Sequence, residues 1–136
     1  MINIAVMKHT TLACMAAAVA LTGGLQACPE IYDARVEAEK IMDSFKNSWT
    51  NMGRMDDCSN MKILINYVAA HAKSCPTCKK EAGFIWQSNF DKSVEKWQKD
   101  KLAMVDSIRA KIEVGAASEE DLIRTFGFLL GSFLAL

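Results

Sequence analysis

The chain has 136 residues, equal numbers of basic and acidic side chains (16 and 16), and a hydrophobic fraction of 51%. This length predicts one domain with a core of its own. The neutral charge balance argues against nucleic-acid binding, which needs a basic surface, and the apolar content argues against intrinsic disorder.

Residues 1–27 contain no acidic side chain and one lysine, Lys8, which is followed by an apolar run over 10–21. A basic start, a short apolar run and a small residue before the cut are typical of a bacterial secretory signal peptide. The run is too short to span a membrane, which takes roughly 20 apolar residues. We therefore expect removal of 1–27, which leaves 28–136 as a single helical domain. A buried N-terminal helix is the alternative.

The expected cut site has two interpretations. Leu25, Ala27 and Cys28 stand where a lipobox has them, so the site resembles that of bacterial lipoproteins; Gln26 departs from the small residue usual there. The resemblance implies a lipid on Cys28 and a place in the periplasm or on the periplasmic face of the outer membrane. The alternative is ordinary cleavage after Ala27, which leaves Cys28 as a plain thiol.

The mature chain shows helical periodicity from its start. Pro29 suits a first helical position, and apolar residues recur at three- and four-residue steps up to Met52, with Gly53 as a C-terminal cap. This predicts a helix over 29–52. A second helix is expected over 60–73. Its broad apolar surface is centred on Met61, Leu64, Ile65, Val68 and Ala72.

Residues 74–78 are expected to form a turn, after which helical spacing continues over 80–114. One helix of that length would measure about 52 Å, so we expect a break at Ser88 and Asn89. Ser118 and the acidic residues after it cap a last helix. No strand pattern is evident, and the fold prediction is all-α, a small bundle of four to five helices.

The C-terminal segment 126–136 is nearly all apolar and contains Gly127 and Gly131 at a spacing that allows close helix approach. One interpretation is a central core helix. The other is a contact with a partner protein or the membrane, through Phe126, Leu130 and Phe133.

Four cysteines remain after export to an oxidising compartment: Cys28, Cys58, Cys75 and Cys78. The simplest disulfide is a local Cys75–Cys78 bridge, with Cys58 free or paired between molecules. A bridge from Cys28 to Cys75 or Cys78 is the next choice. The predicted first helix is longer than the second by several turns, which argues against that bridge.

The Cys75–Cys78 motif allows three further hypotheses. It suits thiol-disulfide chemistry, although redox enzymes place the motif after a strand. It also suits a metal ion held by His71, Cys75 and Cys78 with Cys58 as fourth ligand. Covalent haem is a third reading, but Lys79 stands where haem attachment normally has histidine.

No catalytic motif is present, so we predict a non-enzymatic protein without cofactor or resident metal. The leading hypothesis is an exported helical protein, anchored by a lipid on Cys28 or by its C-terminal helix, that binds another protein in the cell envelope. Secretion or conjugation assembly factors and toxin-immunity proteins belong to this class. The alternative is a periplasmic thiol-disulfide, metal or haem protein built on Cys75 and Cys78.

Overall fold

A computed structural model describes residues 28–81, 89–116 and 118–136 of the chain. The expected signal peptide, 1–27, lies outside the described residues. The helices are α3 (Pro29–Asn47), α4 (Asn51–Ser74), α5 (Pro76–Glu81), α7 (Phe90–Val114) and α8 (Glu119–Leu134). Within these ranges no strand occurs, which confirms the all-α bundle.

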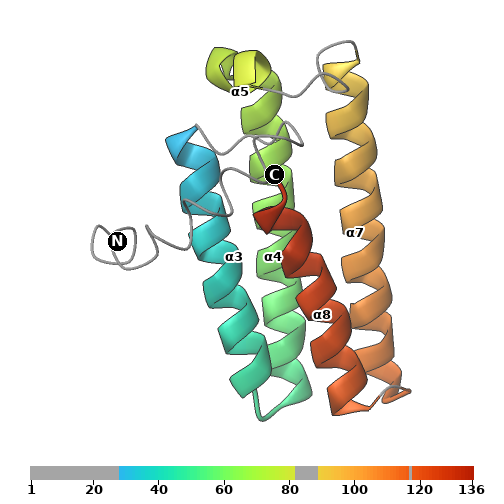
Figure 1. The fold of residues 1–136 in the computed structure, drawn as a ribbon. Helices are drawn as coiled ribbons and strands as arrows, with labels where there is room; N and C mark the ends of the chain where they lie inside the picture. The colour runs from blue at the N-terminus through green and yellow to red at the C-terminus, as the bar shows by residue number, and fades with distance from the viewer. Residues whose placement is uncertain (1–27, 82–88, 117) are drawn as a thin grey trace.

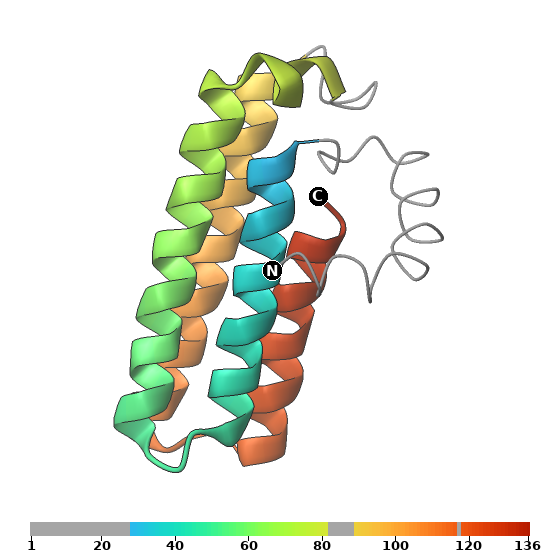
Figure 2. The ribbon, with the colours of Figure 1, turned by 90° about the vertical axis from the view of Figure 1, so that its left-hand side faces the viewer.

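The four long helices form an antiparallel bundle (Figure 1). Contacts join α3 to α4, α4 to α7, α7 to α8 and α8 back to α3, so the four close around one core. The view turned by 90° shows α4 beside α7 and α3 beside α8 (Figure 2). Short α5 lies at the end of the bundle where α4 ends and α7 begins, and it contacts α4.

The predicted boundary between the first two helices was wrong. Thr50 caps α4, and its hydroxyl accepts a hydrogen bond from the backbone N–H of Gly53 at 3.0 Å. Gly53 therefore lies in the first turn of α4 and does not end α3. The second helix begins at Asn51, not at residue 60, and Trp49 stands 99% exposed in the connection instead of on a buried stripe.

The predicted boundaries around α7 and α8 are confirmed, whereas the predicted turn before them is not. Helix α7 starts at Phe90 with Asn89 as its N-cap residue, and Gly115 closes it with a left-handed φ of 62°. Ser118 caps α8 by accepting from the backbone N–H of Asp121 at 3.1 Å. The turn expected over 74–78 is shorter than predicted, because α5 already begins at Pro76.

Helix α8 is a core helix. Phe126 and Phe133 are fully buried and Leu130 is half-buried, so the two phenylalanines present no surface to a partner. The ring of Phe126 stacks on Phe45 of α3 with 3.9 Å between centroids, and Phe133 meets Trp97 of α7 edge-on at 5.6 Å. Gly131 has open space around it, so the small-residue spacing serves no close approach there. Among the described helices, none combines the length and apolar content needed to cross a membrane.

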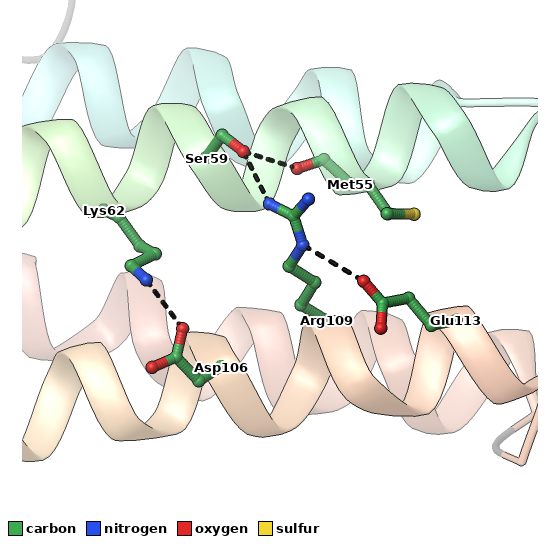
Figure 3. Close-up of polar contacts among 6 residues, drawn as sticks. All are labelled: Met55, Ser59, Lys62, Asp106, Arg109 and Glu113. Carbon is green, nitrogen blue, oxygen red and sulfur yellow. Dashed lines mark hydrogen bonds and ion pairs between the residues drawn. The ribbon is translucent and has the colours of Figure 1, made fainter.

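Polar contacts fix α4 against α7 at the solvent-facing edge of their interface (Figure 3). Lys62 donates to Asp106 at 2.8 Å. Arg109 donates to the hydroxyl of Ser59 at 2.9 Å and to Glu113 at 3.4 Å, while Ser59 donates to the carbonyl of Met55. These contacts are exposed or half-buried, so they set the alignment of the helices more than they add stability.

The stacked phenylalanines give a test of the core. Phe126→Ala should lower the free energy of unfolding by about 3–5 kcal/mol, because it removes a buried ring. Phe128→Ala on the same helix should change it by about 0.5 kcal/mol or less, since Phe128 is 68% exposed. Urea unfolding followed by circular dichroism measures both, and equal losses would contradict this core.

Candidate metal centre

One end of the bundle brings together side chains from three helices. Cys28 is the N-cap residue of α3, His71 lies in the last turn of α4, Cys75 is the C-cap residue of α4, and Cys78 lies in α5. Their three sulfur atoms and one imidazole nitrogen all lie within 4.8 Å of one another. We call these four residues the Cys3His cluster.

The helix lengths explain why the cluster forms. The 19 residues of α3 rise about 28 Å, which α4 matches between Asn51 and about residue 70. Cys28 therefore lies level with His71 across the α3–α4 hairpin. Cys75 follows His71 by one helical turn and shares its face, and α5 then turns the chain back so that Cys78 joins them.

The distances within the cluster approach those of a tetrahedral metal site. The sulfur of Cys28 lies 3.1 Å from Nε2 of His71 and 4.0 Å from the sulfur of Cys75. In a zinc site with Zn–S bonds of about 2.3 Å, neighbouring sulfur atoms lie about 3.8 Å apart. Side-chain shifts of about 1 Å would therefore place all four ligand atoms around one ion.

Burial differs among the three thiols. Cys28 and Cys78 are 1% and 0% exposed, whereas Cys75 is half-buried and accessible from solvent. Burial is the main cause that raises the pKa of Cys28 and, more strongly, the pKa of Cys78. The pKa of Cys75 is lowered, chiefly because the backbone N–H of Cys78 donates to its sulfur. A bound cation would favour the thiolate form of all three.

Glu30 and Tyr67 lie next to the Cys3His cluster. The carboxylate of Glu30 accepts from the Cys28 thiol at 3.1 Å and lies 3.9 Å from Nε2 of His71. The Cys28 thiol is also the main cause that lowers the pKa of Glu30. The ring of Tyr67 lies parallel to that of His71, one turn away, with 6.0 Å between centroids. Neighbouring side chains of this kind orient the ligands, and the Glu30 carboxylate adds negative charge near a bound cation.

The structure corrects two predictions about the cysteines. All four cysteines of the described part are free, so the predicted Cys75–Cys78 disulfide is not formed. Cys58, predicted as a fourth metal ligand, lies about 20 Å from His71 along α4. It is fully buried, and burial raises its pKa to about 11. Cys28 takes the fourth position instead.

The described part of the chain is thus a small all-α bundle with a set of candidate metal ligands at one end. In comparisons with known proteins, no family model, no curated protein and no solved structure matches the chain.

The pKa shifts predict which thiol reacts first. In the reduced, metal-free protein, iodoacetamide should modify Cys75 at lower pH than an ordinary cysteine, because its thiolate forms there. Cys58 should react only near pH 11, since burial disfavours its thiolate, and Cys78, whose pKa is raised further, should react last. Peptide mass spectrometry over a pH series measures both, with the urea-unfolded chain as reference. Faster modification of Cys58 than of Cys75 would contradict this electrostatic picture.

Proposed function

We propose that this protein is exported to the cell envelope and binds a zinc ion through Cys28, His71, Cys75 and Cys78. The observation that carries the proposal is the convergence of these four ligand atoms, from three helices, within 4.8 Å. The ion would fasten the start of α3 to the end of α4 and to α5. Its binding free energy would add to the stability of this end of the bundle.

The chemistry of the ligands favours zinc. Three thiolates and one imidazole are soft to borderline donors, which suit zinc and are a poor match for magnesium or calcium. Four protein ligands also complete a tetrahedral shell, as in structural zinc sites, whereas catalytic zinc keeps a position open for water. The proposed role is accordingly structural, in keeping with the prediction of a non-enzymatic protein.

Metal binding and lipidation compete for the same sulfur. A lipid on Cys28 must reach a membrane, but the sulfur is almost fully buried and faces His71 and Cys75. A thioether sulfur is also a far weaker zinc ligand than a thiolate. The proposal therefore combines export with ordinary cleavage after Ala27, the second interpretation of the cut site.

Metal analysis of the exported protein tests this function. We expect about one zinc ion per chain, and cobalt in its place should give the absorption bands of a tetrahedral thiolate site. Cys75→Ser and His71→Ala should each weaken zinc affinity on the order of 100-fold, because one of four ligands is lost. Competition with a chelator of known affinity measures the change.

Cys58→Ala is the control, because Cys58 is a buried cysteine outside the cluster. It should leave zinc affinity unchanged. The denatured mass of the same preparation should show a chain that starts at Cys28 without lipid. A lipid-modified mass, or equal losses for Cys58→Ala and Cys75→Ser, would overturn the proposal.

A second candidate function, binding of a protein partner in the envelope, rests on the surface of α4. Ile63 and Tyr67 are 66% and 49% exposed on neighbouring turns of α4. They border a groove of about 340 Å³ between α3 and α4, lined by Glu37, Ile41, Asn60, Ile63, Leu64 and Tyr67. Exposed apolar side chains gathered in this way are typical of interaction surfaces. This surface replaces the phenylalanines of α8, which lie in the core.

Crosslinking from the groove tests the second candidate. A photo-crosslinking residue in place of the exposed Asn60 should give one specific adduct with an envelope protein in intact cells. Ile63→Lys should reduce the adduct about 10-fold or more, a loss of about 1.4 kcal/mol. Val114→Lys on α7 is the control, because Val114 is similarly exposed (74%) but lies outside the groove. Equal adduct yields from both variants would contradict this candidate.

A further inference from the structure

Two sulfur atoms of the Cys3His cluster belong to residues far apart in the sequence. The sulfur atoms of Cys28 and Cys75 lie 4.0 Å apart, although the residues are 47 positions apart. A disulfide needs the two atoms at about 2.05 Å, so a shift of about 2 Å would join them. Cys75 is half-buried and the other two cysteines are almost fully buried, so an oxidant from solvent meets Cys75 first.

We propose that oxidation of the cluster joins Cys75 to Cys28, not to its neighbour Cys78, and that this disulfide replaces the metal ion as the link between α3 and α4. The choice of cysteines stands on the geometry of the thiols alone. The exchange with a metal ion rests on the proposed zinc function.

The reaction needs a disulfide as oxidant, either a small disulfide or that of an exported oxidase. The Cys75 thiolate attacks one sulfur of the oxidant, which forms a mixed disulfide and releases the first thiolate. Cys28 then loses its proton, and its thiolate attacks the Cys75 sulfur and displaces the second thiolate. The two cysteines lose two electrons and two protons in total, and the oxidant is reduced to two thiols.

The surroundings of the Cys28 sulfur favour Cys28 in the second step. Nε2 of His71 lies 3.1 Å from this sulfur, close enough to take its proton when that nitrogen is the acceptor. The Cys28 sulfur therefore has both the Cys75 sulfur and a proton acceptor within about 4 Å.

The choice of partner decides what the disulfide does. A Cys75–Cys78 bridge would close a loop of four residues and constrain only the start of α5. A Cys28–Cys75 bridge closes a long loop and holds α3 against α4, which limits the unfolded state far more. The same two helices would then be joined in the reduced protein by zinc and in the oxidised protein by a covalent bond.

The test is a disulfide map of the metal-free mature protein after treatment with oxidised glutathione, with the remaining thiols alkylated before digestion. We expect a linked peptide pair that contains Cys28 and Cys75, with Cys58 and Cys78 alkylated. Cys78→Ser should form the same pair. Oxidation should also raise Tm by at least about 5 °C in both proteins, and Cys28→Ser should lose this rise.

A Cys75–Cys78 or Cys28–Cys78 pair as the main product would overturn the proposal, even if zinc binds. The wild-type map decides the pairing even if Cys28→Ser does not fold. In the zinc-loaded protein, oxidised glutathione should release the ion, seen with a colorimetric zinc indicator, at the rate at which the disulfide forms. A protein that forms the Cys28–Cys75 bond but never binds zinc would overturn the metal function and leave the pairing intact.

Discussion

The length of the α3–α4 hairpin is the constraint on which the candidate site depends. Residues 48–50 make the connection, so each residue of α3 faces a fixed level of α4. This register brings Cys28 to His71 at one end of the bundle. An α3 longer by one helical turn would move Cys28 about 5 Å along α4 and separate the ligands. The cluster is therefore a property of the hairpin more than of the Cys75–Cys78 motif.

Crowding of thiols at this end has an electrostatic cost that the fold must offset. Three sulfur atoms and the Glu30 carboxylate lie close together, and two of the sulfurs are nearly excluded from water. Burial opposes ionisation of Cys28 and Cys78, and the thiolate of Cys75 gains hydrogen bonds from the backbone of α5. A bound dication would compensate the negative charge of the thiolates. A disulfide would remove that charge, because its two sulfur atoms no longer ionise.

Much of the fold was predictable from local patterns, whereas the cluster was not. The periodicity of α4 identified its inner face correctly, and the residues expected there are buried: Met61, Leu64, Ile65, Val68 and Ala72. The cap at Ser118 followed from its acidic neighbours. The end of α3 was predicted wrongly at Gly53, because a glycine after an apolar stripe suits a helix end as well as a first helical turn. The cap at Thr50 distinguishes the two cases, and because it is a local contact to Gly53, three residues on, Thr50 was the sequence signal for this helix start.

The position of Cys28 depends on the same boundary. With a second helix that begins at residue 60, α3 is the longer helix and Cys28 extends past the end of its partner. With a start at Asn51, α4 has 24 residues against 19 in α3, and it passes the level of Cys28 near His71. The lipobox resemblance concerns only the residues around Cys28, so it carries no information on His71. The location of Phe126 and Phe133 was ambiguous for a different reason. An apolar helix end has the same sequence pattern whether it packs in a core or lies at an interface.

In the proposed function, the order of events after export decides which chemistry Cys28 undergoes. The cut site would be read before α3 and α4 have paired and brought His71 and Cys75 to Cys28. The residues before the cut would then act before the cluster can protect the thiol. Gln26 occupies the position where a lipobox has a small residue. In the proposed function, this single departure leaves Cys28 unmodified long enough for the hairpin to enclose it.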